Sequence, residues 1–141
     1  MKKKMIVALF LASLMLLLIV TNAFASTTLT VTGYTAGGGY GKVKCTGTLE
    51  YANSTSAGGD RVTAKTKSAI DESRNWVQAK IYFAQGSGNS SRSSTGSGNG
   101  TSYASATVKP TAEGHGYKGT SSHVVNTDNY GGWTDSQSAT W

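Results

Sequence analysis

The chain of 141 residues contains only one cysteine, Cys45, and one proline. A single cysteine excludes any disulfide within the chain, so the fold must be held together by packing alone. Cys45 alternates with Val43 and Leu49, which predicts a thiol on a buried strand face. Pairing of this thiol with a second chain stays open as the alternative.

Motifs of catalysis and metal binding are absent from the sequence. There is no nucleophile elbow, no paired-histidine helix motif and no calcium loop. A Ser–His–Asp arrangement or a His–His–carboxylate metal site can be drawn around His115 and His123. The nearby carboxylates, Asp128 and Asp135, stand at no diagnostic spacing from these histidines. We therefore predict no catalytic residue, no cofactor and no metal.

Long apolar runs are absent after residue 20. The single run, residues 5–20, follows Lys2, Lys3 and Lys4 and precedes two small residues, Ala23 and Ala25. This order predicts a signal peptide over residues 1–25 that is cleaved after Ala25, with an uncleaved membrane anchor as the alternative. The cleavage site has no cysteine to carry a lipid, and no later run could anchor the chain, so we expect a secreted protein.

Large blocks of positive charge are also missing once the signal peptide is removed. The remaining 116 residues carry ten Lys or Arg and seven Asp or Glu, a net charge of +3. This charge is too small and too scattered to predict nucleic-acid binding. It weakly favours anionic cell walls or lipid headgroups. A Lys-rich signal together with the lack of disulfides indicates a bacterial protein, which we expect to come from a Gram-positive cell.

Glycine, serine and threonine are abundant, and apolar residues alternate with polar ones along several segments. The clearest case is 41–51, where Val43, Cys45, Leu49 and Tyr51 share one face. Gly, Ser and Thr weaken helices and suit short strands joined by turns. The sequence predicts a single all-β domain over 26–141, an antiparallel β-sandwich or flattened barrel of about seven strands. These strands are expected at 28–34, 41–51, 61–70, 76–84, 101–109, 117–126 and 133–141.

Two segments in the middle of the chain are harder to assign. Residues 71–85 are open between strand and helix: 76–84 fit a strand after a polar turn, but Val77, Ile81 and Ala84 also have helical spacing after a possible cap at Asp71. Residues 86–100 contain Gly, Ser, Asn and Thr with one Arg and no apolar side chain. We expect this second segment to be a mobile loop, because it has nothing to bury.

Aromatic residues give the best candidates for a binding surface. Trp76 and Tyr82 face away from the apolar side of their segment and could stack on sugar rings or lie at a lipid surface. Lys42 and Lys44 add positive charge on a second segment. These four residues form the predicted binding surface, whereas Trp133 and Trp141 are expected to close the core.

The C-terminal part carries a resemblance to a known family. Residues 119–126, GTSSHVVN, are followed by Gly132-Trp133 and by the final Ser138-Ala139-Thr140-Trp141. Over 119–141 the chain resembles the lactococcin 972 type of secreted bacteriocin. The resemblance implies a small disulfide-free β-sandwich from a Gram-positive bacterium and assigns no functional residue.

Taken together, these features predict a small secreted protein that acts by binding a cell-envelope polymer or membrane surface, in its sharpest form as an antimicrobial. A self-assembling matrix-type protein is the first alternative, and a secreted hydrolase is the second. The sequence fixes neither the ligand nor the oligomeric state.

Overall fold

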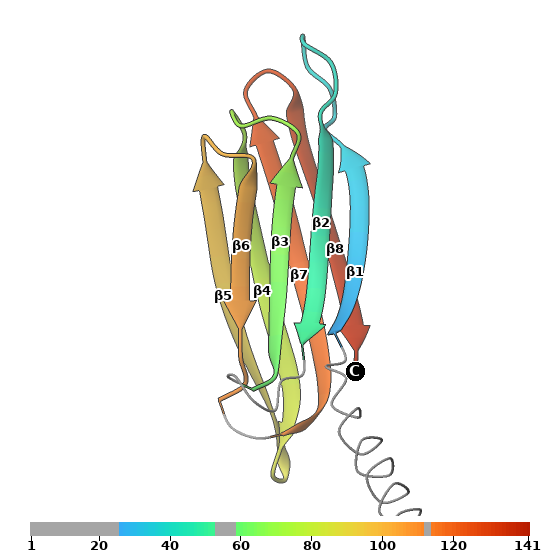
Figure 1. The fold of residues 1–141 in the computed structure, drawn as a ribbon, viewed down its shortest axis with the longest axis vertical. Helices are drawn as coiled ribbons and strands as arrows, with labels where there is room; N and C mark the ends of the chain where they lie inside the picture. The colour runs from blue at the N-terminus through green and yellow to red at the C-terminus, as the bar shows by residue number, and fades with distance from the viewer. Residues whose placement is uncertain (1–25, 53–58, 112–113) are drawn as a thin grey trace, which may run out of the picture.

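The computed structural model describes residues 26–52, 59–111 and 114–141 as two four-stranded antiparallel sheets that pack face to face (Figure 1). One sheet has the strand order β1-β2-β3-β6 and the other β5-β4-β7-β8. The predicted all-β sandwich is therefore confirmed, with eight strands instead of seven. The strands are β1 (Ser26–Tyr34), β2 (Lys44–Ala52), β3 (Arg61–Ser68), β4 (Arg74–Gln85), β5 (Gly88–Asn99), β6 (Tyr103–Val108), β7 (His115–Thr127) and β8 (Gly131–Thr140).

The core is built from the alternating residues that point inward from both sheets. In β2 and β3 every second residue is buried, and β4 supplies more buried apolar side chains than any other strand. Full burial of one such aliphatic or aromatic side chain contributes roughly 1.5–3 kcal/mol. The central cluster includes Leu49, Val62, Ala64, Val77, Ala79, Ile81 and Phe83.

The segment that was ambiguous between helix and strand is strand β4. It pairs with β5 on one side and with β7 on the other, so it lies at the centre of the second sheet. Asp71 and Glu72, the possible helix cap and its neighbour, are exposed turn residues. Two ladders of backbone hydrogen bonds, together with β-branched and aromatic residues, favour the strand over the helix. Within the described residues no helix is long and apolar enough to cross a membrane.

The expectation of a loop at 86–100 is wrong. This stretch forms the hairpin turn Gly86-Ser87 and then β5, twelve residues that pair with β4 along their whole length. Gly86 has a φ of 57°, the positive value that a two-residue hairpin turn requires. The strand needs no apolar residue of its own because β4 supplies the buried surface, and β5 contributes mainly backbone hydrogen bonds.

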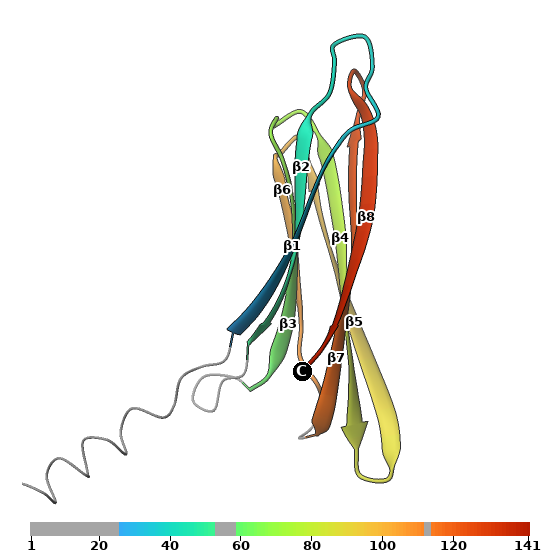
Figure 2. The same cartoon turned by 90° about the vertical axis from the view of Figure 1, so that its right-hand side faces the viewer.

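Glycine allows β5 to approach β6 of the opposite sheet very closely. A Cβ on Gly96 would lie 1.9 Å from the backbone oxygen of Ser105, and one on Gly98 would lie 2.3 Å from that of Tyr103. The two sheets therefore meet backbone to backbone along this side, with almost no side-chain layer between them. Figure 2 shows the sandwich from the side that carries β1 and β8.

The opposite side is filled by tryptophan. Trp133 is buried beside Cys45 and Val125, and Trp141 stacks on Tyr51 with ring centroids 4.6 Å apart. The prediction that both tryptophans close the core is confirmed, as is the burial of the Cys45 thiol. The predicted cleavage residues, Ala23 and Ala25, lie outside the described residues.

Candidate binding surface

The four residues predicted as one binding surface lie on two opposite faces of the sandwich. Trp76 and Tyr82 point outward from β4, in the sheet β5-β4-β7-β8. Lys44 points outward from β2, in the other sheet, and Lys42 lies exposed just before that strand. The structure therefore does not bring the aromatic pair and the lysine pair together, and each must be considered with its own neighbours.

The aromatic pair has a polar setting. Trp76 is half-buried between Ser97 of β5 and Val124 of β7, its cross-strand neighbours. Tyr82 is 37% exposed, and the Lys80 ammonium lies 4.6 Å from its ring centroid. The two rings are six residues apart on one strand, roughly 20 Å at the rise of an antiparallel strand. They are separate side chains on this face, not a continuous aromatic patch.

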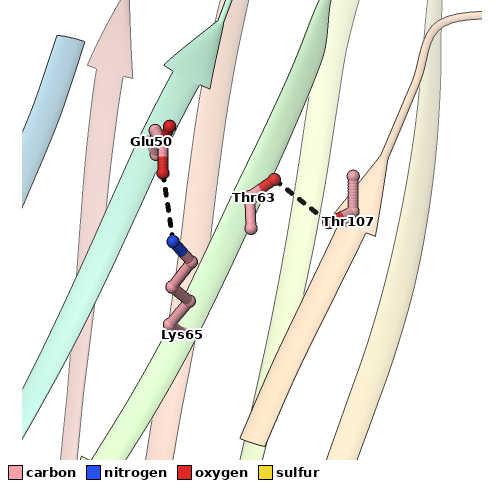
Figure 3. A network of polar contacts seen from close by, with 4 residues as sticks. All are labelled: Glu50, Thr63, Lys65 and Thr107. Carbon is pink, nitrogen blue, oxygen red and sulfur yellow. Dashed lines mark hydrogen bonds and ion pairs between the residues drawn. The ribbon is translucent and has the colours of Figure 1, made fainter. Parts of the chain in front are cut away.

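The outer face of the sheet β1-β2-β3-β6 carries most of its charge as lysine and arginine. We call it the basic face, and its cations are Lys44, Lys65, Lys67 and Arg61. Lys65 donates to Glu50 Oε2 at 3.2 Å, and nearby Thr63 and Thr107 share a hydrogen bond of 3.0 Å (Figure 3). The centre of the face is thus neutralised, because Lys65 is paired with Glu50, its diagonal neighbour on β2.

Positive charge without a partner lies at one end of the basic face. Lys44 on β2 and Lys67 on β3 form no ion pair with any described residue. Lys67 lies opposite Thr46, and Lys44 is two residues from Thr46 on the same strand. The two lysines are diagonal neighbours, about 7–8 Å apart along the sheet. Both therefore have room to contact one anionic group.

An exposed tyrosine flanks each of these lysines. Tyr34 of β1 lies directly opposite Lys44 and is 60% exposed, and Tyr103 of β6 lies opposite Lys67 and is 47% exposed. Tyr34, Lys44, Lys67 and Tyr103 thus come from four adjacent strands, and we call them the Tyr–Lys row. Between its two lysines is a shallow hollow of about 220 Å³, lined by Lys44, Thr46, Lys67, Ser68 and Ala69.

The chemistry of the Tyr–Lys row is that of an anion-binding platform. Ammonium groups act as point charges toward phosphate and carboxylate, and hydroxyl groups of Thr46 and the tyrosines can donate hydrogen bonds. The tyrosine rings offer faces for stacking on a sugar or polyol chain. The hollow is too open to exclude water, so the arrangement suits the binding of an extended ligand.

The histidine considered for catalysis is a core residue. His123 is 1% exposed and bridges the sheets, with Nδ1 2.9 Å from Thr66 Oγ1 and Nε2 2.9 Å from Ser121 Oγ. Gln137 Oε1 lies 3.1 Å from the same Nε2. Burial lowers the pKa of this imidazole, and the opposing effects of Gln137 and Asp135 are smaller. The ring has partners at both nitrogens and offers no face to a substrate.

The second histidine is far from the first. His115 is exposed at the start of β7, eight residues from His123 on the same strand, roughly 27 Å at the usual rise. The two rings cannot share one metal ion. Among residues 26–52, 59–111 and 114–141 no three His, Cys, Asp or Glu side chains gather as a metal site would require.

No protein-family model, no curated protein and no solved structure matches this chain. The resemblance of residues 119–141 to the lactococcin 972 type stays a prediction.

Three members of the Tyr–Lys row, Tyr34, Lys67 and Tyr103, were missed by sequence reasoning. Each stands at an outward position of a predicted strand, so the alternation of side chains could have predicted its exposure. The alternation could not predict that the three lie side by side, because this depends on β6 pairing with β3, a strand 35 residues or more distant along the chain.

Proposed function

We propose that this protein is secreted and acts without catalysis, by binding an anionic polymer of a bacterial cell envelope through the Tyr–Lys row. The observation that carries the proposal is the juxtaposition of Lys44 and Lys67, two cations with no carboxylate partner in the part of the chain that the structure describes, between two exposed tyrosines. The net charge of +3 after residue 25 favours the same class of ligand.

The direct test measures binding to isolated Gram-positive cell walls. The protein, purified from a secreting host that expresses the full chain, is sedimented with walls before and after chemical removal of their phosphate polymers. We expect binding to untreated walls that weakens with added salt, because the contacts are electrostatic and exposed. Binding whose strength changes neither with added salt nor with removal of the phosphate polymers would contradict the proposal.

A matched pair of double variants locates the site. Lys44→Gln with Lys67→Gln should weaken binding roughly tenfold or more, since a lysine near an anionic surface contributes about 1 kcal/mol. Lys80→Gln with Lys118→Gln removes the same charge from the outer face of the other sheet. This control should bind almost as tightly as the unmodified protein. Equal loss in both variants would mean that net charge, and not the Tyr–Lys row, determines binding.

Secretion and antimicrobial action need their own measurements. The species in the medium should begin at Ser26 by intact mass, whereas the full 141-residue chain found only in membranes would show that the signal is not cleaved. The bacteriocin-like form of the proposal depends on the resemblance at 119–141. Growth inhibition and dye leakage in a panel of Gram-positive strains would support it, and no effect on any strain would limit the function to wall binding.

A further inference from the structure

The two sheets together have four edge strands, β1 and β6 in one and β5 and β8 in the other. An edge strand presents unpaired backbone N–H and C=O groups, which can pair with another chain. Folded proteins block such edges by shortening them, by covering them or by placing charges that point inward. The four edges of this sandwich differ sharply in this respect.

Three of the four edges are blocked. β6 has only six residues, and the backbone oxygens of Tyr103 and Ser105 lie against the glycines of β5. β5 carries Arg92 on its inner side, opposite buried Ile81. β8 carries Asp135 on its inner side, opposite buried His123. An inward-facing charge at an edge strand would be trapped if a second chain paired there.

β1 has none of these features. Its nine residues, STTLTVTGY, contain no charged side chain and no proline, and it pairs with β2 in an unbroken register without a bulge. Leu29 and Val31 point inward but are only half-buried, because the sheet ends at this strand. Figure 1 shows β1 at one margin of the sandwich.

The backbone groups available at this edge can be assigned from the register. Thr35 N donates to Val43 O at 3.0 Å, and this pair continues the β1–β2 register beyond Tyr34 and Lys44. In an antiparallel ladder the hydrogen-bonded pairs alternate. Residues 29, 31 and 33 therefore bond to β2, whereas the N–H and C=O groups of Thr28, Thr30 and Thr32 point toward the open side.

The sequence of β1 is nearly symmetric about Thr30. Reading outward in both directions gives Leu29 and Val31 and then Thr28 and Thr32. We propose that β1 pairs with β1 of a second copy, antiparallel and about a two-fold axis at Thr30, and so joins two sandwiches into a dimer with one eight-stranded sheet. Thr30 then bonds to its own counterpart, and Thr28 bonds to Thr32 of the second copy.

This register pairs the backbone groups and also gives favourable side-chain contacts. Threonines meet threonines on the outer face, a favourable cross-strand pair, and Leu29 covers Val31 of the second copy on the inner face. No charge is buried at the seam. The dimer places both Tyr–Lys rows on one continuous sheet face, so a long polymer could engage two sites at once and gain avidity.

The experiment compares the sedimentation of the protein over a concentration series with that of two lysine variants. Thr30→Lys puts two like charges directly opposite each other at the axis and should weaken the dimer roughly tenfold. Thr48→Lys is the matched control, because Thr48 lies opposite Thr30 on β2 and points to the same face. Its two copies would be about 14 Å apart, beyond the screening length, so the control should dimerise normally.

A proline variant tests the backbone directly. Thr30→Pro removes an N–H that the monomer does not use and should abolish the dimer, while circular dichroism reports whether the fold is kept. Ser138→Pro is its counterpart on the open side of β8 and should leave the dimer unchanged. In the unmodified protein, the amides of Thr28, Thr30 and Thr32 should exchange with solvent more slowly as concentration rises, whereas that of Ser138 should not.

Three outcomes would overturn the proposal. The first is a protein that stays monomeric at every concentration. The second is a dimer that survives both Thr30→Lys and Thr30→Pro, which would place the interface elsewhere. The third is protection of the β1 amides only when a different protein is added, which would make β1 an edge for a foreign strand instead of a second copy.

Discussion

Gly47 of β2 and His123 of β7 face each other across the core, and the glycine provides the space that the imidazole occupies. A Cβ at position 47 would lie only 2.6 Å from His123 Cδ2. The ring is also stacked with Trp133 at a centroid distance of 6.3 Å. A polar ring is thus held in the middle of an apolar sandwich by a missing side chain on one sheet and by hydrogen bonds to both sheets. Thr66 is in the same sheet as Gly47, whereas Ser121 and Gln137 are in the other.

Gly47→Ala should destabilise the fold by about 1–3 kcal/mol, because the added methyl must displace a ring that has partners at both nitrogens. The measurement is the free energy of unfolding in urea. Gly39→Ala is the control, since a Cβ there meets no atom within 4 Å. If both substitutions cost the same, the contact with His123 is not what requires glycine at position 47.

Stability should fall as the pH drops below about 6.5. Burial lowers the pKa of His123 in the folded state, so the unfolded chain, with an ordinary value near 6.5, binds the proton more readily. The stability present above that pH is lost as the pH falls from about 6.5 toward the lowered pKa. Urea midpoints at pH 7.5 and 5.5 should therefore differ for the unmodified protein.

Urea midpoints at the same two pH values, measured in two variants, identify the histidine that causes the pH effect. His123→Gln should be less stable overall but should show a much smaller difference between the two pH values. His115→Gln, which changes an exposed ring, should keep the full difference. A pH effect that disappears in the His115 variant and persists in the His123 variant would reverse the assignment.

Gly96→Ala should loosen β5 from β6. The new methyl would lie 1.9 Å from the Ser105 backbone oxygen, so the backbone must move, at a cost of about 1–3 kcal/mol or more. Hydrogen exchange at the β5 amides should accelerate more than at the β2 amides. Gly88→Ala on the same strand, where the nearest atom is 4.0 Å away, should change stability by less than about 0.5 kcal/mol.

Cys45 should be unreactive in the folded protein. Burial raises the pKa of its thiol to about 11, and its Sγ lies 3.5 Å from Val43 O inside the core. A thiol reagent should label it slowly in buffer and rapidly in urea. Cys45→Ser should leave the assembly state unchanged on a non-reducing gel, and loss of a covalent dimer on that substitution would show that the thiol is accessible.

The alternation of side chains was enough to predict the class of fold, the approximate positions of seven strands and the inner face of the clearest one, 41–51. Val43, Cys45 and Leu49 are buried as the period of two requires. β5 was not predicted, because its composition gives no sign of burial and its position is determined by its pairing with β4. The one local signal for it was the pair Gly86-Ser87, a two-residue hairpin turn placed directly after a strand.

The candidate site could be predicted only in part. The outward positions of Lys44, Trp76 and Tyr82 follow from alternation, but the faces to which they belong depend on which sheet each strand joins. Nothing near Trp76 in the sequence says that its strand crosses to the opposite sheet from β2. The sheet that each strand joins is determined by long-range strand pairing, and this pairing depends on the packing of the whole chain.

The strand order also governs how the molecule can be divided. The chain changes sheets between β3 and β4, again between β5 and β6, and a third time between β6 and β7. Any cut between strands after β3 leaves a fragment whose sheet lacks either a partner strand or the layer that covers it. Neither half is self-sufficient, so fragments should be unstructured apart and regain the fold only by complementation. We therefore expect the domain to unfold as a single all-or-none unit, although the composition of its middle segment, 86–100, predicted a mobile loop.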